Sequence, residues 1–170
     1  MIIGIAGYAQ TGKDTAATAL IDLGFKRHAF ADRLKDEVNW MLEAVGHVID
    51  THKEDEKKSW RDFLVFWGAK MRKIRPDYWV EHLHKSISTK DVVITDVRYL
   101  NEVNWILNQG GTIIRLHRPG VTAANEEERM SFMIIDQAIL HSVINIDNEG
   151  TIEDLHSKIK ALDFLKPAAI

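Results

Sequence analysis

Short apolar runs alternate with amphipathic stretches along the chain, and this alternation predicts its secondary structure. Residues 2–6 form a continuous apolar run, and we also expect strands at residues 92–97 and 112–118. Uninterrupted apolar runs of this length are typical of strands that are buried on both faces. We expect two further strands, at residues 25–30 and 142–146.

Apolar residues at helical spacing fill the segments between these predicted strands. We expect Gly24 to end the first helix, Asp32 to cap the next one and Pro76 to open another. Thr151 and Asp154 have the spacing of a capping box, which predicts the start of a closing helix. Strands that alternate with helices in this way imply a parallel sheet with helices on both faces. The sequence therefore predicts an α/β fold of three layers with a five-stranded parallel sheet, in one domain that spans residues 1–170.

A glycine-bounded loop separates the first predicted strand from the first predicted helix. The segment Gly7-Tyr-Ala-Gln-Thr-Gly12-Lys13 fits the beginning of the phosphate-loop motif G-x-x-x-x-G-K-[ST]. The glycines let successive N–H groups point inward at a phosphate, and the following helix adds its positive N-terminal end. An ordinary strand-to-helix turn is the alternative, but the apolar strand before the loop and the helix after it favour nucleotide binding.

The residues around the loop suggest how ATP and Mg²⁺ would be held. Lys13 would reach the β- and γ-phosphates, and Thr15 would donate to the α-phosphate. Asp14 stands where the motif has a hydroxyl ligand of Mg²⁺, so it would hold the ion directly or through water. Asp96 follows a buried apolar run, as a second magnesium-ordering acid does; capping the next helix is a compatible role. The predicted nucleotide and metal residues are Gly7, Gln10, Thr11, Gly12, Lys13, Asp14, Thr15 and Asp96.

Several basic residues lie near the ends of the predicted strands. Transfer of a phosphoryl group to a phosphate acceptor brings two anions together, and fixed cations must offset their repulsion. The candidate cations are Arg33, Lys35, Arg72, Arg75, Arg98, Arg118 and Arg129. A single arginine is more often a solvated surface residue, but Arg98 lies beside Asp96. Trp67 and Trp79 are either core residues or walls for a nucleotide base.

Composition excludes several other classes of protein. The chain has no cysteine, so a disulfide framework and a thiolate zinc site are both excluded. A formal net charge of −3 without a basic tail argues against binding to polymeric nucleic acid. No apolar run approaches the ~20 residues of a membrane-spanning helix. We therefore expect a cytoplasmic enzyme that binds small nucleotides, without a membrane or nucleic acid partner.

Several motifs together make the chain similar to the phage deoxynucleoside monophosphate kinase family, over nearly its whole length. The resemblance rests on GKDT within Gly7–Thr15, on Phe30–Lys35, on Asp96–Arg98 followed by Asn101 and Glu102, and on Asn145–Gly150. The segment GAKMRKIRPDYWV contributes to it as well. Because GKDT is usual in that family, the resemblance explains Asp14. One departure is that members often carry a His-x-Ser-Glu-like element in the lid, where this chain has Arg129–Phe132.

The resemblance implies a P-loop kinase fold with an acceptor-binding helical region at about residues 32–88 and a lid at about 119–140. It implies transfer of the ATP γ-phosphoryl group to a deoxynucleoside 5′-monophosphate, with Mg²⁺ as cofactor. The residues it places on the acceptor side are Asp32, Arg33, Lys35, Arg72 and Trp79, together with Arg98 on the acceptor phosphate. It makes Arg118 and Arg129 arginines of the lid.

Two other functions are compatible with the sequence. One is a different small-metabolite kinase on the same fold, such as a dephospho-coenzyme A or phosphomevalonate kinase. The other is a nucleotide-binding switch without catalysis, against which the number of basic residues at strand ends argues. The bases accepted and the oligomeric state, with a homodimer among the options, are not specified by the sequence.

Overall fold

The apolar runs form a five-stranded parallel sheet in the computed structural model, which describes residues 1–138 and 143–165. Its strands are β1 (Ile2–Ala6), β2 (Lys26–His28), β3 (Val92–Val97), β4 (Thr112–His117) and β5 (Val143–Asp147). They lie in the order β2-β3-β1-β4-β5, and the register places Ile3 opposite Val93. The predicted sheet is confirmed, with β1 at its centre.

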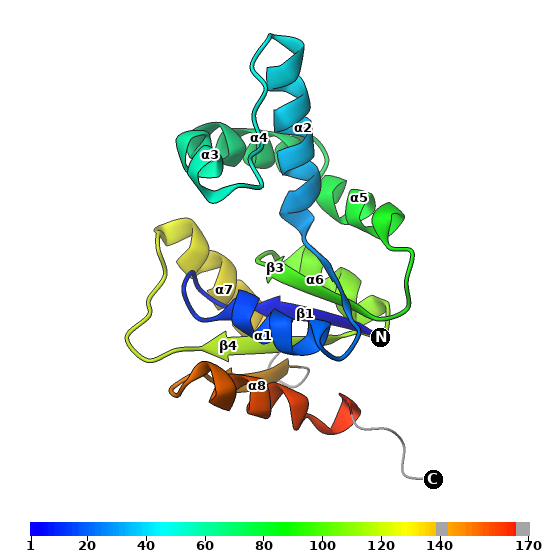
Figure 1. Cartoon of the computed structure of the whole chain (residues 1–170), viewed down its shortest axis with the longest axis vertical. Helices are drawn as coiled ribbons and strands as arrows, with labels where there is room; N and C mark the ends of the chain where they lie inside the picture. Colours follow the sequence, from blue (N-terminus) through cyan, green and yellow to red (C-terminus); the bar gives the residue numbers. More distant parts are fainter. Residues whose placement is uncertain (139–142, 166–170) are drawn as a thin grey trace. The chain divides into compact units, whose positions relative to one another are not determined.

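The chain folds into two compact units (Figure 1). The first unit contains Met1–Arg27 and the chain from Thr89 onward, and it carries the sheet. The second unit contains His28–Ser88 and consists of helices. The region at residues 32–88 that the resemblance assigns to the acceptor falls within the second unit.

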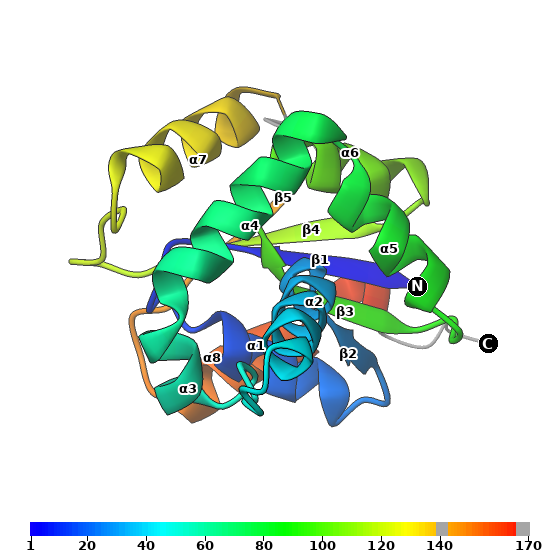
Figure 2. The same cartoon turned by 90° about the horizontal axis from the view of Figure 1, so that it is seen from above.

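Helices cover both faces of the sheet in the first unit. The helices are α1 (Lys13–Ile21), α6 (Leu100–Asn108), α7 (Glu126–Ala138) and α8 (Ile152–Lys160), with a short 3-10 turn, η1 (Asp163–Leu165), near the end. Figure 2 shows α1 and α8 on one side of β1 and β4, and α6 and α7 on the other side. The fully buried Ile3 and Ile5 belong to the core that β1 shares with α1 and α8. The two predicted helical layers are therefore present.

The opposite face of β1 depends on a close approach at Gly4. A Cβ atom at this position would lie 2.6 Å from the Ile106 side chain and 2.8 Å from that of Ile113. Both distances are shorter than any ordinary contact, so α6 packs as closely as it does because β1 has no side chain here.

The second unit is a cluster of four helices with a small core of its own. Its helices are α2 (Phe30–Ala44), α3 (Glu54–Ser59), α4 (Arg61–Ile74) and α5 (Tyr78–Ser86). Val38, Leu42 and Leu64 are its buried centre, where α2 meets α4. Across the described parts of both units, every helix is too short or too polar to cross a bilayer.

The structure corrects three boundaries that the sequence predicted. The second strand ends at His28, and the buried Phe30 is already the first residue of α2. Ala29 therefore occupies the cap position, so the prediction that Asp32 caps this helix was wrong. Pro76 lies before α5, which begins at Tyr78. Ser142 of the last predicted strand, and residues 139 and 140 of the lid range, lie outside the described residues.

The capping box at the start of α8 provides a test of this fold. The Thr151 hydroxyl accepts the N–H of Asp154 at 3.2 Å, and the Asp154 carboxylate accepts the N–H of Thr151 at 2.9 Å. Thr151→Ala should lower the free energy of unfolding by about 1 kcal/mol, because a backbone donor of α8 loses its partner. Urea unfolding measures the loss. Thr18→Ala, on the exposed middle of α1, should change it by less than about 0.5 kcal/mol; equal losses in both variants would contradict the assignment.

Candidate active site

The loop at residues 7–12 joins β1 to α1 through a tight turn. Gln10 and Gly12 both adopt left-handed backbone conformations, with φ angles of 66° and 97°. Thr11 between them is buried, and its hydroxyl donates to the carbonyl oxygen of Tyr8 at 2.9 Å. Left-handed residues within a short turn bring successive N–H groups to one concave side, which forms an anion-binding nest. The loop therefore has the backbone shape that phosphate binding requires.

Asn148, in the turn between β5 and α8, forms a hydrogen bond with this loop. Its side-chain amide donates to the carbonyl oxygen of Thr11 at 2.9 Å, and its backbone N–H donates to that of His117 at 2.7 Å. A Cβ atom at Gly12 would lie 2.6 Å from the same amide nitrogen. The sequence singled out residues 145–150 through the family resemblance alone and gave Asn148 no role. The structure shows that it fixes the loop to the end of β4.

Lys13 is the first residue of α1, and its ammonium group folds back over the loop. It donates to the carbonyl oxygens of Gly7 and Tyr8, each at 2.8 Å. Burial lowers the pKa of Lys13, and the positive charge of Arg98 lowers it further. Three carboxylates act in the opposite direction, those of Glu128, Asp14 and Asp96. A bound phosphate would give this ammonium a stronger partner and raise its pKa.

Two of these carboxylates, those of Asp14 and Asp96, are the ones predicted to hold a magnesium ion. Asp14 is exposed in the first turn of α1, and Asp96 is half-buried one residue before the end of β3. Within the described residues, no three acidic or histidine side chains gather as a complete metal cage. Mg²⁺ in nucleotide sites typically uses one or two carboxylates, phosphate oxygens and water. Asp14 and Asp96 therefore suit Mg²⁺ that arrives with a nucleotide.

Arg98 follows β3 on a backbone that Glu102 holds in place. The buried Glu102 carboxylate accepts the N–H groups of Arg98 and Tyr99, at 2.7 and 3.0 Å. The Ser131 hydroxyl of α7 donates to the carbonyl oxygen of Arg98. The Arg98 side chain is exposed and close enough to Lys13 to lower its pKa. Arg98 and Lys13 thus place two positive charges at the same end of the sheet.

Glu128 of α7 is a site residue that the sequence did not reveal. One carboxylate oxygen accepts the N–H of Ala9 in the loop at 3.2 Å, and the other accepts the N–H of Ala124 at 2.7 Å. The residue is buried, and its charge raises the pKa of Lys13. A carboxylate therefore lies against the phosphate loop and uses one of its amide donors.

An arginine that packs against two aromatic rings also joins α7 to the loop. The Arg115 guanidinium lies 4.1 Å from the Phe132 ring centre and 5.1 Å from that of Tyr8. Its Nε donates to Asp136 at 3.2 Å, and the two rings meet edge to face. Cation–π contacts of this kind hold Tyr8 of the loop against α7.

The two arginines predicted for the lid make no hydrogen bond to the loop in the part of the chain that the structure describes. Arg118 is exposed after β4. Arg129 on α7 is exposed and donates through Nε to Glu126 of the same helix at 2.8 Å. Within residues 1–138 and 143–165, neither arginine donates a hydrogen bond to the phosphate loop. Their role as lid arginines stays a prediction.

Apart from Arg98, the residues predicted for the acceptor lie in the second unit. Arg33 of α2 donates through Nε to Glu37 at 2.9 Å, and Trp67 of α4 donates to the same carboxylate at 2.9 Å. Lys35 lies 3.9 Å from Asp32 on the same helix. The structure thus brings Arg33 and Trp67 together through Glu37, a residue that the sequence did not single out.

Trp79 and Arg72 lie near the helix crossing of α4 and α5. Trp79 is buried, and its indole N–H donates to the carbonyl oxygen of Gly68 at 3.2 Å. A Cβ atom at Gly68 would lie 3.5 Å from the Arg72 guanidinium. Trp79 therefore serves the packing of α5 on α4, which is the core role that the sequence left open for it.

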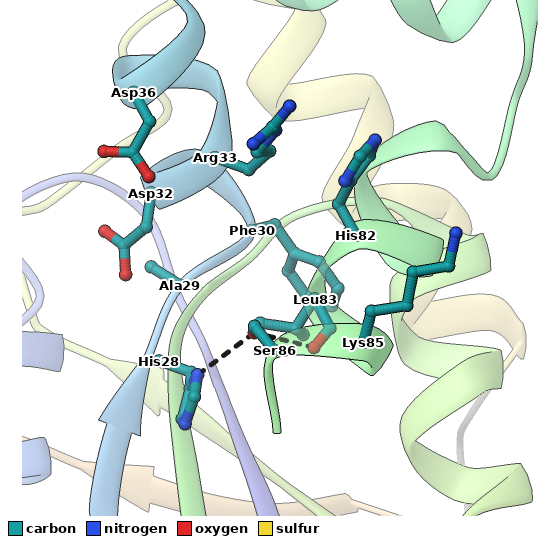
Figure 3. Close-up of a pocket in the computed structure, with 10 residues that line it drawn as sticks. All are labelled: His28, Ala29, Phe30, Asp32, Arg33, Asp36, His82, Leu83, Lys85 and Ser86. Atoms are coloured by element: carbon teal, nitrogen blue, oxygen red, sulfur yellow. Dashed lines mark hydrogen bonds between the residues drawn. The ribbon is translucent and has the colours of Figure 1, made fainter. Parts of the chain in front are cut away.

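A pocket of about 400 Å³ lies between α2 and α5 (Figure 3). Asp32 and Arg33 line it from α2, and His82, Lys85 and Ser86 line it from α5. Burial lowers the pKa of His82, and the charge of Arg33 lowers it further, so the imidazole is neutral at pH 7. Arg33 and Lys85 are positively charged and Asp32 is negatively charged, so the pocket offers side chains of both signs to a ligand.

Comparison with known sequences finds a relative that matches nearly the whole of this chain. A protein of Acanthamoeba polyphaga mimivirus that bears the provisional name deoxynucleotide monophosphate kinase is 30% identical to the chain. The match covers 94% of this chain and 94% of that protein. No family model matches the chain.

Solved structures share the fold. TT1252 from Thermus thermophilus superposes with a TM-score of 0.54 at 19% identity, over 95% of each chain. A gluconokinase from Sinorhizobium meliloti 1021 superposes with a TM-score of 0.50 at 12% identity, over 92% of this chain and 87% of its own. At these identities the similarity concerns the fold alone.

The contact between Glu128 and the loop generates a prediction about nucleotide affinity. Glu128→Gln should tighten binding of a nucleoside triphosphate about fivefold, because it removes a negative charge beside the phosphates. The repulsion between that charge and the phosphates is expected to be roughly 1 kcal/mol. Calorimetric titration with ATP measures the dissociation constant.

Glu127→Gln is the matched control, since it makes the same change of charge one residue away, where the carboxylate accepts the Tyr99 hydroxyl. Its affinity should stay within about twofold of the unaltered chain. Weaker ATP binding in Glu128→Gln, or equal tightening in both variants, would contradict the role given to Glu128.

Proposed function

The chain belongs to the same family as the mimivirus protein provisionally named deoxynucleotide monophosphate kinase, and we propose that it transfers the γ-phosphoryl group of ATP to a deoxynucleoside 5′-monophosphate. The product would be the deoxynucleoside diphosphate. The observation that carries the proposal is the phosphate loop, with Lys13 folded over it. The sequence match to this relative, over 94% of both chains, supports it. Its partners would be small nucleotides.

The donor half of the reaction would use the first unit. The amides of residues 7–12 and the N-terminal end of α1 would cradle the triphosphate, with the Thr15 hydroxyl on the α-phosphate. Lys13 would exchange the carbonyl oxygens of Gly7 and Tyr8 for the β- and γ-phosphates. Asp14 and Asp96 would hold Mg²⁺, which when bound supplies positive charge to the phosphate oxygens.

The chemical step would need no covalent group of the protein. A phosphate oxygen of the acceptor attacks the γ-phosphorus, and the bond from that phosphorus to the β–γ bridging oxygen breaks, so that ADP leaves with the electron pair. Arg98, at the end of β3, would neutralise charge on the acceptor phosphate, and Lys13 would neutralise charge on the transferred group.

The acceptor would be bound by side chains of the second unit. Arg33 is its best candidate, because its guanidinium is held at one edge by Glu37 while the side chain stays 43% exposed. Asp32, Lys35, Trp67 and Arg72 would complete this half of the site. Arg118 and Arg129 would act from the lid when it closes, which would keep water from the γ-phosphate.

A coupled assay of ADP formation across a panel of acceptors tests the proposal. Deoxynucleoside monophosphates should stimulate ADP formation, while dephospho-coenzyme A, phosphomevalonate and gluconate should not. Lys13→Ala should reduce the stimulated rate at least about a hundredfold, because the transferred phosphoryl group loses its closest cation. Circular dichroism should show the variant folded.

Two results would decide against the proposal. Stimulation by one of the other metabolites and by no nucleotide would assign a different acceptor to the same fold. Tight ATP binding without turnover of any acceptor would identify a nucleotide-binding switch.

A further inference from the structure

One buried carboxylate joins three helices of the second unit. Glu37 on α2 accepts the Arg33 Nε–H and the Tyr78 hydroxyl on one oxygen, at 2.9 and 2.6 Å. Its other oxygen accepts the Trp67 indole N–H of α4 at 2.9 Å. The residue is 7% exposed, so these donors replace water around it.

Glu37 is ionised in this setting. Burial alone would raise the pKa of Glu37, but hydrogen bonds from Tyr78, Trp67 and Arg33 outweigh it and hold the pKa below its usual value. Burial also raises the pKa of Tyr78, and the neighbouring carboxylate adds to that rise. The phenol therefore stays protonated and donates a hydrogen bond to Glu37. The cluster is therefore an anion held by two neutral donors and one cation.

The hydrogen bond from the Arg33 Nε–H to Glu37 fixes the direction of the Arg33 guanidinium. Nε–H is committed to Glu37, whereas the two terminal nitrogens carry the other four of the five N–H donors of an arginine. Figure 3 shows Arg33 on α2 facing His82 on α5 across the pocket. A planar guanidinium held by one edge can still offer a second pair of donors to a phosphate.

We propose that Glu37 is a positioning residue for the acceptor phosphate, acting through Arg33. This rests on the proposed function, in which Arg33 binds the acceptor. Without the carboxylate, Arg33 would have to be ordered by the acceptor itself, and the entropy lost by a long side chain would be subtracted from binding. Glu37 thus orders the Arg33 side chain in the free protein, before the acceptor binds.

The competing view is that Glu37 only fastens α2, α4 and α5 together. Both roles predict a loss of stability when the carboxylate is removed. They differ in what happens to acceptor binding when another donor to Glu37 is removed and the contact between Arg33 and Glu37 is kept. Tyr78 provides that comparison.

The decisive experiment compares Glu37→Gln with Tyr78→Phe in steady-state kinetics. Glu37→Gln puts an amide where Arg33 needs an anion, so the KM for the deoxynucleoside monophosphate should rise about tenfold to a hundredfold. The KM for ATP should stay within about threefold. Tyr78→Phe should lower the unfolding midpoint as much as Glu37→Gln does, but leave the acceptor KM within about threefold.

A double variant shows whether the effect passes through Arg33. In an Arg33→Ala background, Glu37→Gln should add no further increase of the acceptor KM. An unchanged acceptor KM in Glu37→Gln overturns the proposal. So does an equal rise in Tyr78→Phe, or a full additional rise in the Arg33→Ala background.

A signal from Arg33 itself separates this proposal from the proposed function. The Nε–H resonance of Arg33 should exchange slowly with water in the unaltered chain and in Tyr78→Phe, and be lost in Glu37→Gln. If no nucleotide is phosphorylated but this pattern holds, the proposed function fails and the orientation of Arg33 by Glu37 stands. If the resonance survives in Glu37→Gln, Glu37 does not orient Arg33, whatever the enzyme phosphorylates.

Discussion

The donor site depends on one partly buried ammonium group and the turn that accommodates it. Lys13 is satisfied by two carbonyl oxygens of its own loop, which is possible only because the chain reverses within residues 7–12. That reversal requires left-handed residues, and it is stabilised by Asn148 beneath and by Arg115 beside it. The sheet, the turn after β5 and helix α7 therefore all serve to hold one loop in an anion-binding shape.

In the second unit the group that needs fixed partners is negatively charged. There a buried carboxylate, Glu37, is satisfied by donors from three helices, and one of these donors is an arginine whose side chain is 43% exposed. Each unit thus keeps a charge in a low-dielectric setting by surrounding it with fixed partners, which makes the charged group rigid before any ligand arrives. Such preorganised charge is what phosphoryl transfer between two anions requires.

Much of the fold and part of the site follow from the sequence, for reasons visible in particular residues. The phosphate loop and the Thr151 capping box are local, so their spacing along the chain is enough to recognise them. Glu128, Asn148 and Glu37 were missed because their partners lie 119, 137 and up to 41 residues away in the chain. Asp32 was misassigned as a cap because the buried pair Ala29 and Phe30 has the apolar character of a strand, although Phe30 begins a helix.

The role proposed for the loop is to present a γ-phosphoryl group for transfer to a nucleotide acceptor. The most direct measurement follows that group, with ATP labelled at the γ-phosphate and a deoxynucleoside monophosphate as the acceptor. We expect the label in the β-phosphate of the deoxynucleoside diphosphate, in equal amount to the ADP formed. Label released as free phosphate, or label that remains in ATP, would contradict it.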